Sequence, residues 1–339
     1  MKNQLNVFKN KKILIAGGLG FIGSNLARKL IELEANVQII DSLIPEGGGN
    51  FFNVAGIEHK TDIQIADVRN ETQMRTLAEG LDYLFNLAGQ TSHLYSMKDP
   101  YADLELNGRA QLSILEASRK SGSRPKIIFA STRQIYGRPQ VLPVTETHPL
   151  NPIDINGVHK LAAERYHQIY GETYGIRFCI LRLTNTYGPR MRIRDSRQTF
   201  LGHWIHEILN GNEFPIFGDG RQFRDFTFVE DVVEALLLTA ARCEADGEIF
   251  NLGGDQMTLE ELARLLVDLN QSGSYRFVPF PEDLKAIDIG NYCADTSKIQ
   301  SALGWSAKTN LKEGLLQTLH FFKSNLQPYQ AEQKIDAAL

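Results

Sequence analysis

Hydrophobic residues over roughly the first half of the chain form short continuous runs that alternate with segments of helical spacing. A short apolar run between polar turns indicates a strand that is buried on both faces. Apolar residues recur at helical spacing over 103–120 and 157–174. Strands that alternate with helices in this way predict an α/β fold with a doubly wound, mostly parallel sheet. The runs read as strands are Ile13–Ile15, VQIID ending at Asp41, DIQIA, DYLFNLAG, KIIFAS, RFCILRL and EIFNL ending at Leu252.

A glycine-rich turn separates the first of these runs from the first helical stripe. Gly17 permits a sharp reversal, Gly20 lets backbone N–H groups approach a pyrophosphate, and Gly23 lets the helix pack close to the strand. The N-terminus of the helix then offers unpaired donors to the phosphates. Asp41 ends the next strand, where a carboxylate bonds ribose hydroxyls and repels a 2′-phosphate. The pattern therefore predicts that the chain binds NAD rather than NADP.

Other strand ends are expected to complete this cofactor site. The carboxyl ends of parallel strands meet at one edge of a doubly wound sheet. We therefore expect the ends of the third and fourth strands near the adenine and near the middle of the dinucleotide, respectively. The expected cofactor contacts from the turn and the strand ends are Gly17, Gly20, Phe21, Ile22, Gly23, Asp41, Asp67, Val68, Leu87, Ala88 and Gly89.

The second part of the chain has more loops. We expect residues 11–185, completed by part of 225–252, to form the Rossmann domain. Residues 186–224 and 253–325 are expected to form a smaller, mixed α/β substrate domain over the carboxyl edge of the sheet. Within the first domain, residues 42–60 contain Pro45 and Gly47-Gly48-Gly49 and are expected to form a loop without a helix.

Composition and charge narrow the class of protein. The chain has 339 residues, of which 42% are hydrophobic and 22% charged, as in a globular protein. The net charge of −4, without a basic stripe, indicates neither nucleic acid nor a membrane surface as a partner. Cys179, Cys243 and Cys293 are far apart in apolar surroundings, which predicts reduced core thiols and no metal site. Because no signal-peptide or membrane-length apolar segment is seen, we expect a cytoplasmic enzyme.

A series of motifs follows in a fixed order: GGLGFIG at 17–23, DVRN from Asp67, NLAGQ from Asn86, STRQIYG from Ser131, GVHKLAAE around Lys160, LRLTNTYGPR from Leu181, RDFTFVEDVVEA from Arg224 and ADTSKIQSALGW from Ala294. From Lys12 to about Leu319 the chain thereby resembles the extended short-chain dehydrogenase/reductase family, specifically its nucleotide-sugar epimerases and dehydratases. The resemblance implies a tightly bound NAD that takes a hydride from a sugar ring carbon and returns it, as in an epimerase. The alternatives are a dehydrogenase or reductase of the same family and a catalytically weakened binder of nucleotide sugars.

The resemblance also implies the catalytic residues, with one departure. In this family a tyrosine four residues before a lysine takes the proton of the sugar, helped by a serine or threonine hydroxyl. Thr132 and Lys160 match the hydroxyl and the lysine, and Lys160 is also expected to bond the nicotinamide ribose. The residue at the position of the tyrosine is Asn156, whose amide does not ionise near neutral pH.

Another group must then act as the base if the enzyme is active. His93 lies in the loop that borders the sugar in the family, and histidine titrates in the range that general base catalysis requires. Lys160 with a lowered pKa, Tyr95 and Tyr136 are the alternatives. His93 could equally be a loop histidine bonded to the backbone.

The residues expected on the substrate side limit the reaction. Related dehydratases have an Asp-Glu pair directly after the catalytic threonine, and related decarboxylases have Glu at the second of these positions. Here the pair is Arg133-Gln134, which disfavours elimination of water and leaves epimerisation or simple oxidation and reduction. Arg133 could pair with a carboxylate or a charged substituent of the sugar, or contact the diphosphate. The expected contacts to a nucleotide-diphosphate sugar are Gln90, Arg133, Asn185, Arg224 and Lys285, with the lysine in place of a family arginine.

The resemblance further implies a homodimer. In the family the helices that match 103–120 and 157–174 pair across a two-fold axis as a four-helix bundle. Here they carry apolar residues beyond the stripe that covers the sheet, for which the candidates are Leu106, Ile114, Tyr166 and Tyr170.

Overall fold

A seven-stranded parallel sheet forms the centre of the computed structural model, which describes residues 5–45, 47–196 and 199–330. The strand order is β10-β6-β5-β4-β1-β2-β3, and every neighbouring pair runs parallel. The predicted doubly wound parallel sheet is therefore confirmed. The strands are β1 (Lys12–Ala16), β2 (Asn36–Asp41), β3 (Thr61–Ile65), β4 (Tyr83–Asn86), β5 (Lys126–Thr132), β6 (Phe178–Leu183) and β10 (Ile249–Asn251).

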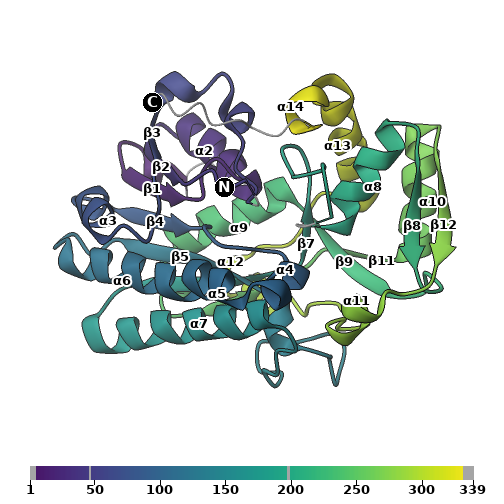
Figure 1. The fold of residues 1–339 in the computed structure, drawn as a ribbon. Coiled ribbons are helices and arrows are strands. Elements are labelled where there is room, and N and C mark those ends of the chain that lie inside the picture. Colours follow the sequence, from purple (N-terminus) through teal and green to yellow (C-terminus); the bar gives the residue numbers. More distant parts are fainter. Residues whose placement is uncertain (1–4, 46, 197–198, 331–339) are drawn as a thin grey trace.

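Helices cover both faces of this sheet (Figure 1). Successive side chains of a strand point to opposite faces, so Ile13 and Leu14 of β1 belong to different cores. Ile13 packs with α2 (Phe21–Glu32) and α9 (Val229–Ala241), and α12 (Ser297–Leu303) completes that side. Leu14 packs with α3 (Glu71–Ala78), α6 (Ala110–Lys120) and α7 (Ile155–Tyr174). Because both faces are covered, the strands are continuous apolar runs.

The helix expected over 103–120 is interrupted. The structure has α4 (His93–Lys98), then α5 (Pro100–Leu104), a π-helical turn η4 (Glu105–Arg109) and α6. Turns of this kind insert one extra residue into a helix and are frequent at functional sites. Here the turn directs Asn107 toward the end of β4, where its Nδ2 donates to the carbonyl of Gln90 at 2.9 Å.

The segment 42–60 also contains more regular structure than expected, because it forms the 3₁₀ turns η2 (Phe51–Val54) and η3 (Glu58–Lys60). The remaining 3₁₀ turns are η1 (Asn6–Phe8), η5 (Arg133–Tyr136) and η6 (Cys243–Ala245).

A second core lies beyond the carboxyl edge of the sheet, on the right of Figure 1. It contains Trp204, Phe214, Leu262 and Leu315, all buried. The predicted boundary at 224/225 lies inside one strand, β9, so the division into residue ranges stays a prediction. The elements here are β7 (Asn185–Tyr187), β9 (Phe223–Phe228) and β11 (Asp255–Thr258) in one sheet, β8 (Glu213–Phe217) and β12 (Ser274–Val278) in another, and helices α8 (Phe200–Leu209), α10 (Leu259–Asn270), α11 (Glu282–Ala286), α13 (Leu311–Asn325) and α14 (Gln327–Gln330).

Two expectations about side-chain burial need correction. Cys179 and Cys293 are buried free thiols as expected, but Cys243 is exposed, because it lies in the η6 turn after α9. Ile114 is fully buried in the core and does not form an additional apolar face of α6.

The other apolar candidates on these helices, Leu106, Tyr166 and Tyr170, are partly buried. Tyr166 and Tyr170 pack against the same core, and Leu106 lines the cleft described below. Among the described residues, no helix is long and apolar enough to cross a membrane.

Candidate functional site

The turn after β1 requires glycine at two positions, Gly17 and Gly23. Gly17 has a φ of +81°, and a Cβ there would lie 3.0 Å from the backbone of Leu87 and Ala88. A Cβ on Gly23 would lie 2.2 Å from the carbonyl oxygen of Gly17. Gly20 is the N-cap of α2, and no side chain caps this helix. The backbone N–H groups of its first turn are therefore left for a ligand, as in phosphate sites at helix N-termini.

Asp41 closes the adjacent side of this turn. Its Oδ2 accepts from the backbone N of Leu19 at 3.1 Å, and its Oδ1 accepts from the backbone N of Leu43 at 3.0 Å. Burial raises the pKa of the Asp41 carboxyl, while these two hydrogen bonds favour its ionised form. Each oxygen retains further acceptor capacity. The carboxylate is thus held at the place where ribose hydroxyls would bond.

All the expected strand-end contacts line one cleft of about 820 Å³. The lining includes Gly17, Gly20, Phe21, Ile22, Gly23, Asp41, Asp67, Val68, Leu87, Ala88, Gly89 and Lys160. An uncapped helix start offers donors to the pyrophosphate, a close-packed glycine turn allows its approach, and a buried carboxylate accepts from ribose hydroxyls, which is what a dinucleotide requires. The residues present therefore fit NAD.

Thr132 and Lys160 lie in the same cleft. Thr132 ends β5, and its Oγ1 accepts from the backbone N of Gln134 at 3.2 Å, which leaves the hydroxyl proton free to be donated. Lys160 comes from α7, and its Nζ donates to the carbonyl of Ala130 at 3.1 Å. Burial lowers the pKa of Lys160 to about 8, although the charges of Asp103 and Glu164 oppose this shift.

Asn156 occupies the first turn of α7, only 1% exposed. Its Nδ2 donates to the carbonyl of Gln90 at 2.8 Å and to Oδ2 of Asp103 at 3.1 Å. Oδ1 of Asp103 in turn lies 2.7 Å from Nδ1 of His159. An amide in these contacts is a fixed polar group and not a base.

His93 is positioned beside a buried carboxylate. Its Nδ1 lies 3.1 Å from Oδ2 of Asp154, whose side chain is fully buried, while the His93 side chain is 31% exposed. Asp154 is the N-cap of α7, since its Oδ1 accepts from the backbone N of Gly157 at 2.6 Å. Gln134 Nε2 donates to Oδ2 of Asp154 at 2.8 Å. Although burial opposes the shift, contacts with His93, Gly157 and Gln134 hold the pKa of Asp154 below its usual value.

The two tyrosines differ in access to the cleft. Tyr95 lines it. Tyr136 is fully buried, donates to Oδ1 of Asn251 at 2.6 Å and accepts from Nη1 of Arg182 at 2.7 Å. Burial raises the pKa of Tyr136 to about 12. Its hydroxyl is therefore a structural hydrogen-bonding group and does not face the cleft.

Two guanidinium groups line the substrate end of the cleft. Nη2 of Arg133 donates to Oδ1 of Asn185 at 3.1 Å, and Nη2 of Arg224 lies 2.9 Å from Oδ1 of Asp288. Burial, together with the charge of Arg133, lowers the pKa of Arg224 to about 10. Nearby, burial raises the pKa of the Asp225 carboxyl to about 6. Nε of Arg133 is buried and has no hydrogen-bond partner among the described residues, so a donor remains for an anionic ligand.

The last two substrate candidates are placed differently. Gln90 lines the cleft, with its Nε2 donating to the carbonyl of Ser92 at 2.8 Å. Lys285 is not brought into this group. Its side chain is exposed, does not line the cleft and lies 3.8 Å from Glu282, because α11 directs it outward.

Two carboxylates of the site, Asp154 and Asp103, were not predicted from the sequence. Asp154 precedes an expected helix and could have been identified as an N-cap, but its contact with His93 joins residues from different elements. Asp103 lies in the interrupted helix, and its contacts with Asn156 and His159 depend on the packing of α5 against α7. No local pattern marks it.

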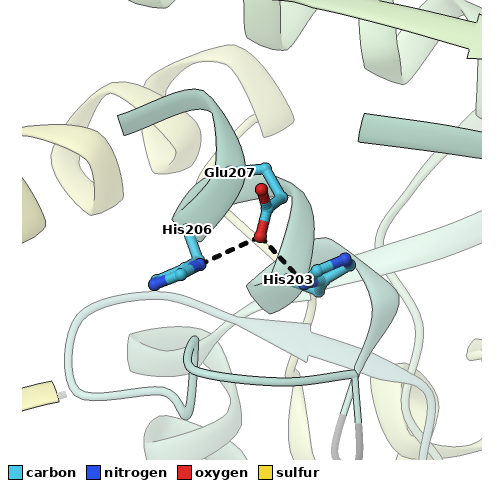
Figure 2. Close-up of side chains that lie close together, drawn as sticks. All are labelled: His203, His206 and Glu207. Carbon is cyan, nitrogen blue, oxygen red and sulfur yellow. Dashed lines mark hydrogen bonds and ion pairs between the residues drawn. The ribbon is translucent and has the colours of Figure 1, made fainter. Parts of the chain in front are cut away.

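One histidine–carboxylate group lies on α8 (Figure 2), and its His203 lines the cleft. Oε1 of Glu207 lies 3.2 Å from Nδ1 of His206 and 3.6 Å from Nδ1 of His203, and all three side chains come from consecutive turns of one helix. Among the described residues it is the one group whose spacing could hold a metal ion. Only the contact of His206 with Glu207 is a hydrogen bond, and a carboxylate between two imidazoles accounts for the geometry without a metal.

Comparisons with known proteins agree with this site. Residues 13–253 match the model of the NAD dependent epimerase/dehydratase family. An uncharacterized UDP-glucose epimerase of Bacillus subtilis is 32% identical over 337 residues, covering 93% of this chain and 99% of that protein.

Solved structures are similar over almost the whole chain. The UDP-glucose 4-epimerase of Thermotoga maritima, solved with UDP-glucose, has a TM-score of 0.84 and 33% identity, and the match covers 93% of this chain and 99% of that one. The dTDP-glucose 4,6-dehydratase DesIV of Streptomyces venezuelae, solved with NAD bound, has a TM-score of 0.87 and 25% identity, with 95% and 99% covered. On these grounds the chain belongs to the NAD dependent epimerase/dehydratase family.

Proposed function

We propose that this protein is an NAD-dependent nucleotide-sugar epimerase in which His93, held by Asp154, replaces the missing tyrosine as the base. The observation that carries this proposal is the meeting of Thr132, Lys160 and the His93–Asp154 pair around one cleft. Asn156 stands at the position of the family tyrosine and cannot accept the proton.

The cofactor would be held by residues already in place. The first turn of α2 would bind the pyrophosphate, Asp41 the adenosine ribose, and Lys160 the nicotinamide ribose. When bound, NAD supplies a hydride acceptor that returns the hydride within one turnover.

The side chains of the protein supply proton transfer and positioning. Nδ1 of His93 is buried against Asp154, so the other ring nitrogen is the one left to take a proton from a sugar hydroxyl. An ionised Asp154 stabilises the imidazolium that this transfer creates. Thr132 can donate its hydroxyl proton to the same sugar oxygen. Protonated Lys160 provides positive charge beside the oxygen as charge develops.

Arg133 and Arg224 support a nucleotide diphosphate as the other part of the substrate. Guanidinium groups match phosphate oxygens in geometry and charge. Arg133-Gln134 also replaces the acidic pair of the dehydratases, and Gln134 is engaged with Asp154. Elimination of water would lack its acid and base, so epimerisation is favoured.

We also propose a homodimer in the cytoplasm. Exposed apolar side chains gather on α5, α6 and α7, with exposures from 36% to 79%. They are Tyr101, Leu104, Leu112, Val158 and Ile169, here called the apolar helix face. Exposed apolar side chains on neighbouring helices are typical of a self-association surface. The three free thiols are typical of a reducing compartment.

The test of the activity is a screen of UDP-, dTDP-, CDP- and GDP-sugars with the NAD-loaded protein. Proton NMR identifies the sugar epimers, and absorbance follows NADH. We expect one nucleotide series to give two interconverting epimers without net NADH. Binding of a sugar nucleotide without any conversion would instead support a weakened binding protein.

A further inference from the structure

We infer that the side-chain carbonyl of Asn156 is a fixed hydrogen-bond acceptor for a hydroxyl of the bound sugar, and that Asp103 is the positioning residue that fixes it. This inference rests on the proposed function, since it concerns the same cleft. It assigns a binding role to the residue that replaces the tyrosine.

The chemistry of the neighbours determines which way the amide points. Both atoms near Nδ2 of Asn156 are pure acceptors, the carbonyl oxygen of Gln90 at 2.8 Å and the carboxylate Oδ2 of Asp103 at 3.1 Å. A carbonyl and an ionised carboxylate require donors, and an amide nitrogen has two. Reversing the amide would place its oxygen against two acceptors. The amide nitrogen therefore faces the protein and the oxygen faces away from it.

Asp103 is itself held in a single arrangement. It is fully buried, and its Oδ1 lies 2.7 Å from Nδ1 of His159, which can donate to it. Burial of a carboxylate is tolerated when its oxygens are hydrogen-bonded. One oxygen is satisfied by His159 and the other by Asn156. The charge of Asp103 also favours the protonated form of Lys160, so the carboxylate supports two groups of the cleft wall.

The carbonyl oxygen of Asn156 is left without a donor. Within the described part of the chain, no hydrogen bond is donated to it, and Asn156 belongs to the lining of the cleft. This oxygen retains accessible surface, so it is an open acceptor on the cleft wall. A sugar hydroxyl in the cleft supplies that donor. Unlike a phenol, this amide binds the hydroxyl without taking its proton, which leaves proton transfer to another group.

The experiment compares the affinity for a sugar nucleotide with that for its parent nucleotide. Calorimetry on the NAD-loaded protein uses the pairs UDP and UDP-glucose, dTDP and dTDP-glucose, CDP and CDP-glucose, and GDP and GDP-mannose. In the pair where the sugar adds affinity, Asn156→Ala should weaken binding of the sugar nucleotide about 5- to 10-fold, the value of one hydrogen bond. Binding of the parent nucleotide should stay within about twofold.

Two further variants separate positioning from general damage. Asp103→Leu keeps a side chain of similar size but removes the acceptor, so we expect a smaller loss that is again confined to the sugar nucleotide. Asn270→Ala is the matched control. It removes a buried amide on α10 that bonds the carbonyls of Ile208 and Ser272, outside the cleft lining, and should change neither affinity.

The calorimetry and the epimer screen together test the role of Asn156 separately from the proposed function. Equal losses for nucleotide and sugar nucleotide in Asn156→Ala, no loss with either, or no sugar contribution in any wild-type pair would overturn this inference. A sugar-specific loss in a protein that interconverts no epimers would leave the inference standing and reject the proposed function. Epimer interconversion without a sugar-specific loss would reject the inference alone.

Discussion

Lys160 carries a charge that depends on its surroundings. Burial lowers the pKa of its ammonium group to about 8, and the carboxylates of Asp103 and Glu164 keep it from falling further. A lysine with a lowered pKa is protonated below that value and loses its charge as the pH rises through it. If the cation assists the reaction, turnover must fall at high pH.

We therefore expect the turnover number of the NAD-loaded protein to decline above about pH 8, by about tenfold per pH unit. Lys160→Arg retains a cation that does not titrate in this range, so the slower variant should lack the decline. A pH–rate profile of both proteins measures this. A decline that persists unchanged in Lys160→Arg would assign the titration to another group.

The residues of the site differ in how far sequence alone could locate them. Gly17, Gly23 and Asp41 lie at the expected turn because their positions depend on local chain geometry after two adjacent strands. The partners of His93 and Asn156 could not be located in this way. Asp154 and Asp103 reach them only when α4, α5 and α7 pack together, and no spacing along the chain encodes that approach.

Among the elements, the connection between β1 and α2 leaves no room for a side chain at Gly23. A Cβ on Gly23 would lie 2.2 Å from the carbonyl oxygen of Gly17, a distance that no side chain can relieve by rotating. Gly23→Ala must therefore push α2 away from β1 and misplace its first N–H groups. We expect NAD affinity, measured by calorimetry, to fall at least about tenfold together with the melting temperature.

Gly304→Ala provides the control for that prediction. Gly304 follows the last turn of α12 with a φ of +71°, and a Cβ added to it would meet no atom within 4 Å. The substitution therefore adds backbone strain of about 1 kcal/mol without a clash. Its melting temperature should fall while its NAD affinity stays unchanged. Wild-type NAD affinity in Gly23→Ala would show that the turn tolerates a side chain.

Regular strands and helices were predicted better than the irregular turns that interrupt or connect them. The strands and α7 follow from apolar runs and helical spacing, and their bounds in the structure lie within a few residues of those expected. The π-helical turn at Glu105–Arg109 was not predicted, because it preserves the apolar stripe while inserting a residue. The 3₁₀ turns in 42–60 lack a periodic signal altogether.

For the molecule as a whole, the apolar helix face carries the dimer prediction. Light scattering at micromolar concentration should give a dimer for the wild type. Leu112→Glu combined with Ile169→Glu would place charges on α6 and α7, two of the three helices of this face, and should give a monomer. Leu316→Glu, at an exposed leucine of α13, is the matched control and should remain a dimer. A monomeric wild type, or a double variant that is still dimeric, would contradict the assignment of this face.

The parallel sheet was predicted in more detail than the second core beyond its carboxyl edge. The parallel sheet could be inferred because each strand has its own apolar run, and successive strands follow the right-handed crossover rule. The second core assembles from segments far apart in the sequence, such as Trp204, Leu262 and Leu315. The pairing of β9 with β7 and β11 depends on long-range contacts, which is why only the approximate extent of this part could be expected.

The central claim is that the cleft epimerises a nucleotide sugar with His93 as its base. The most direct measurement compares epimer interconversion by the NAD-loaded wild type and His93→Gln, with NADH recorded in the same samples. We predict interconversion without net NADH in the wild type, and turnover reduced about 10²- to 10⁴-fold in His93→Gln with NAD and sugar-nucleotide affinities nearly unchanged. NADH that accumulates in step with sugar oxidation, or wild-type turnover in His93→Gln, would contradict the account.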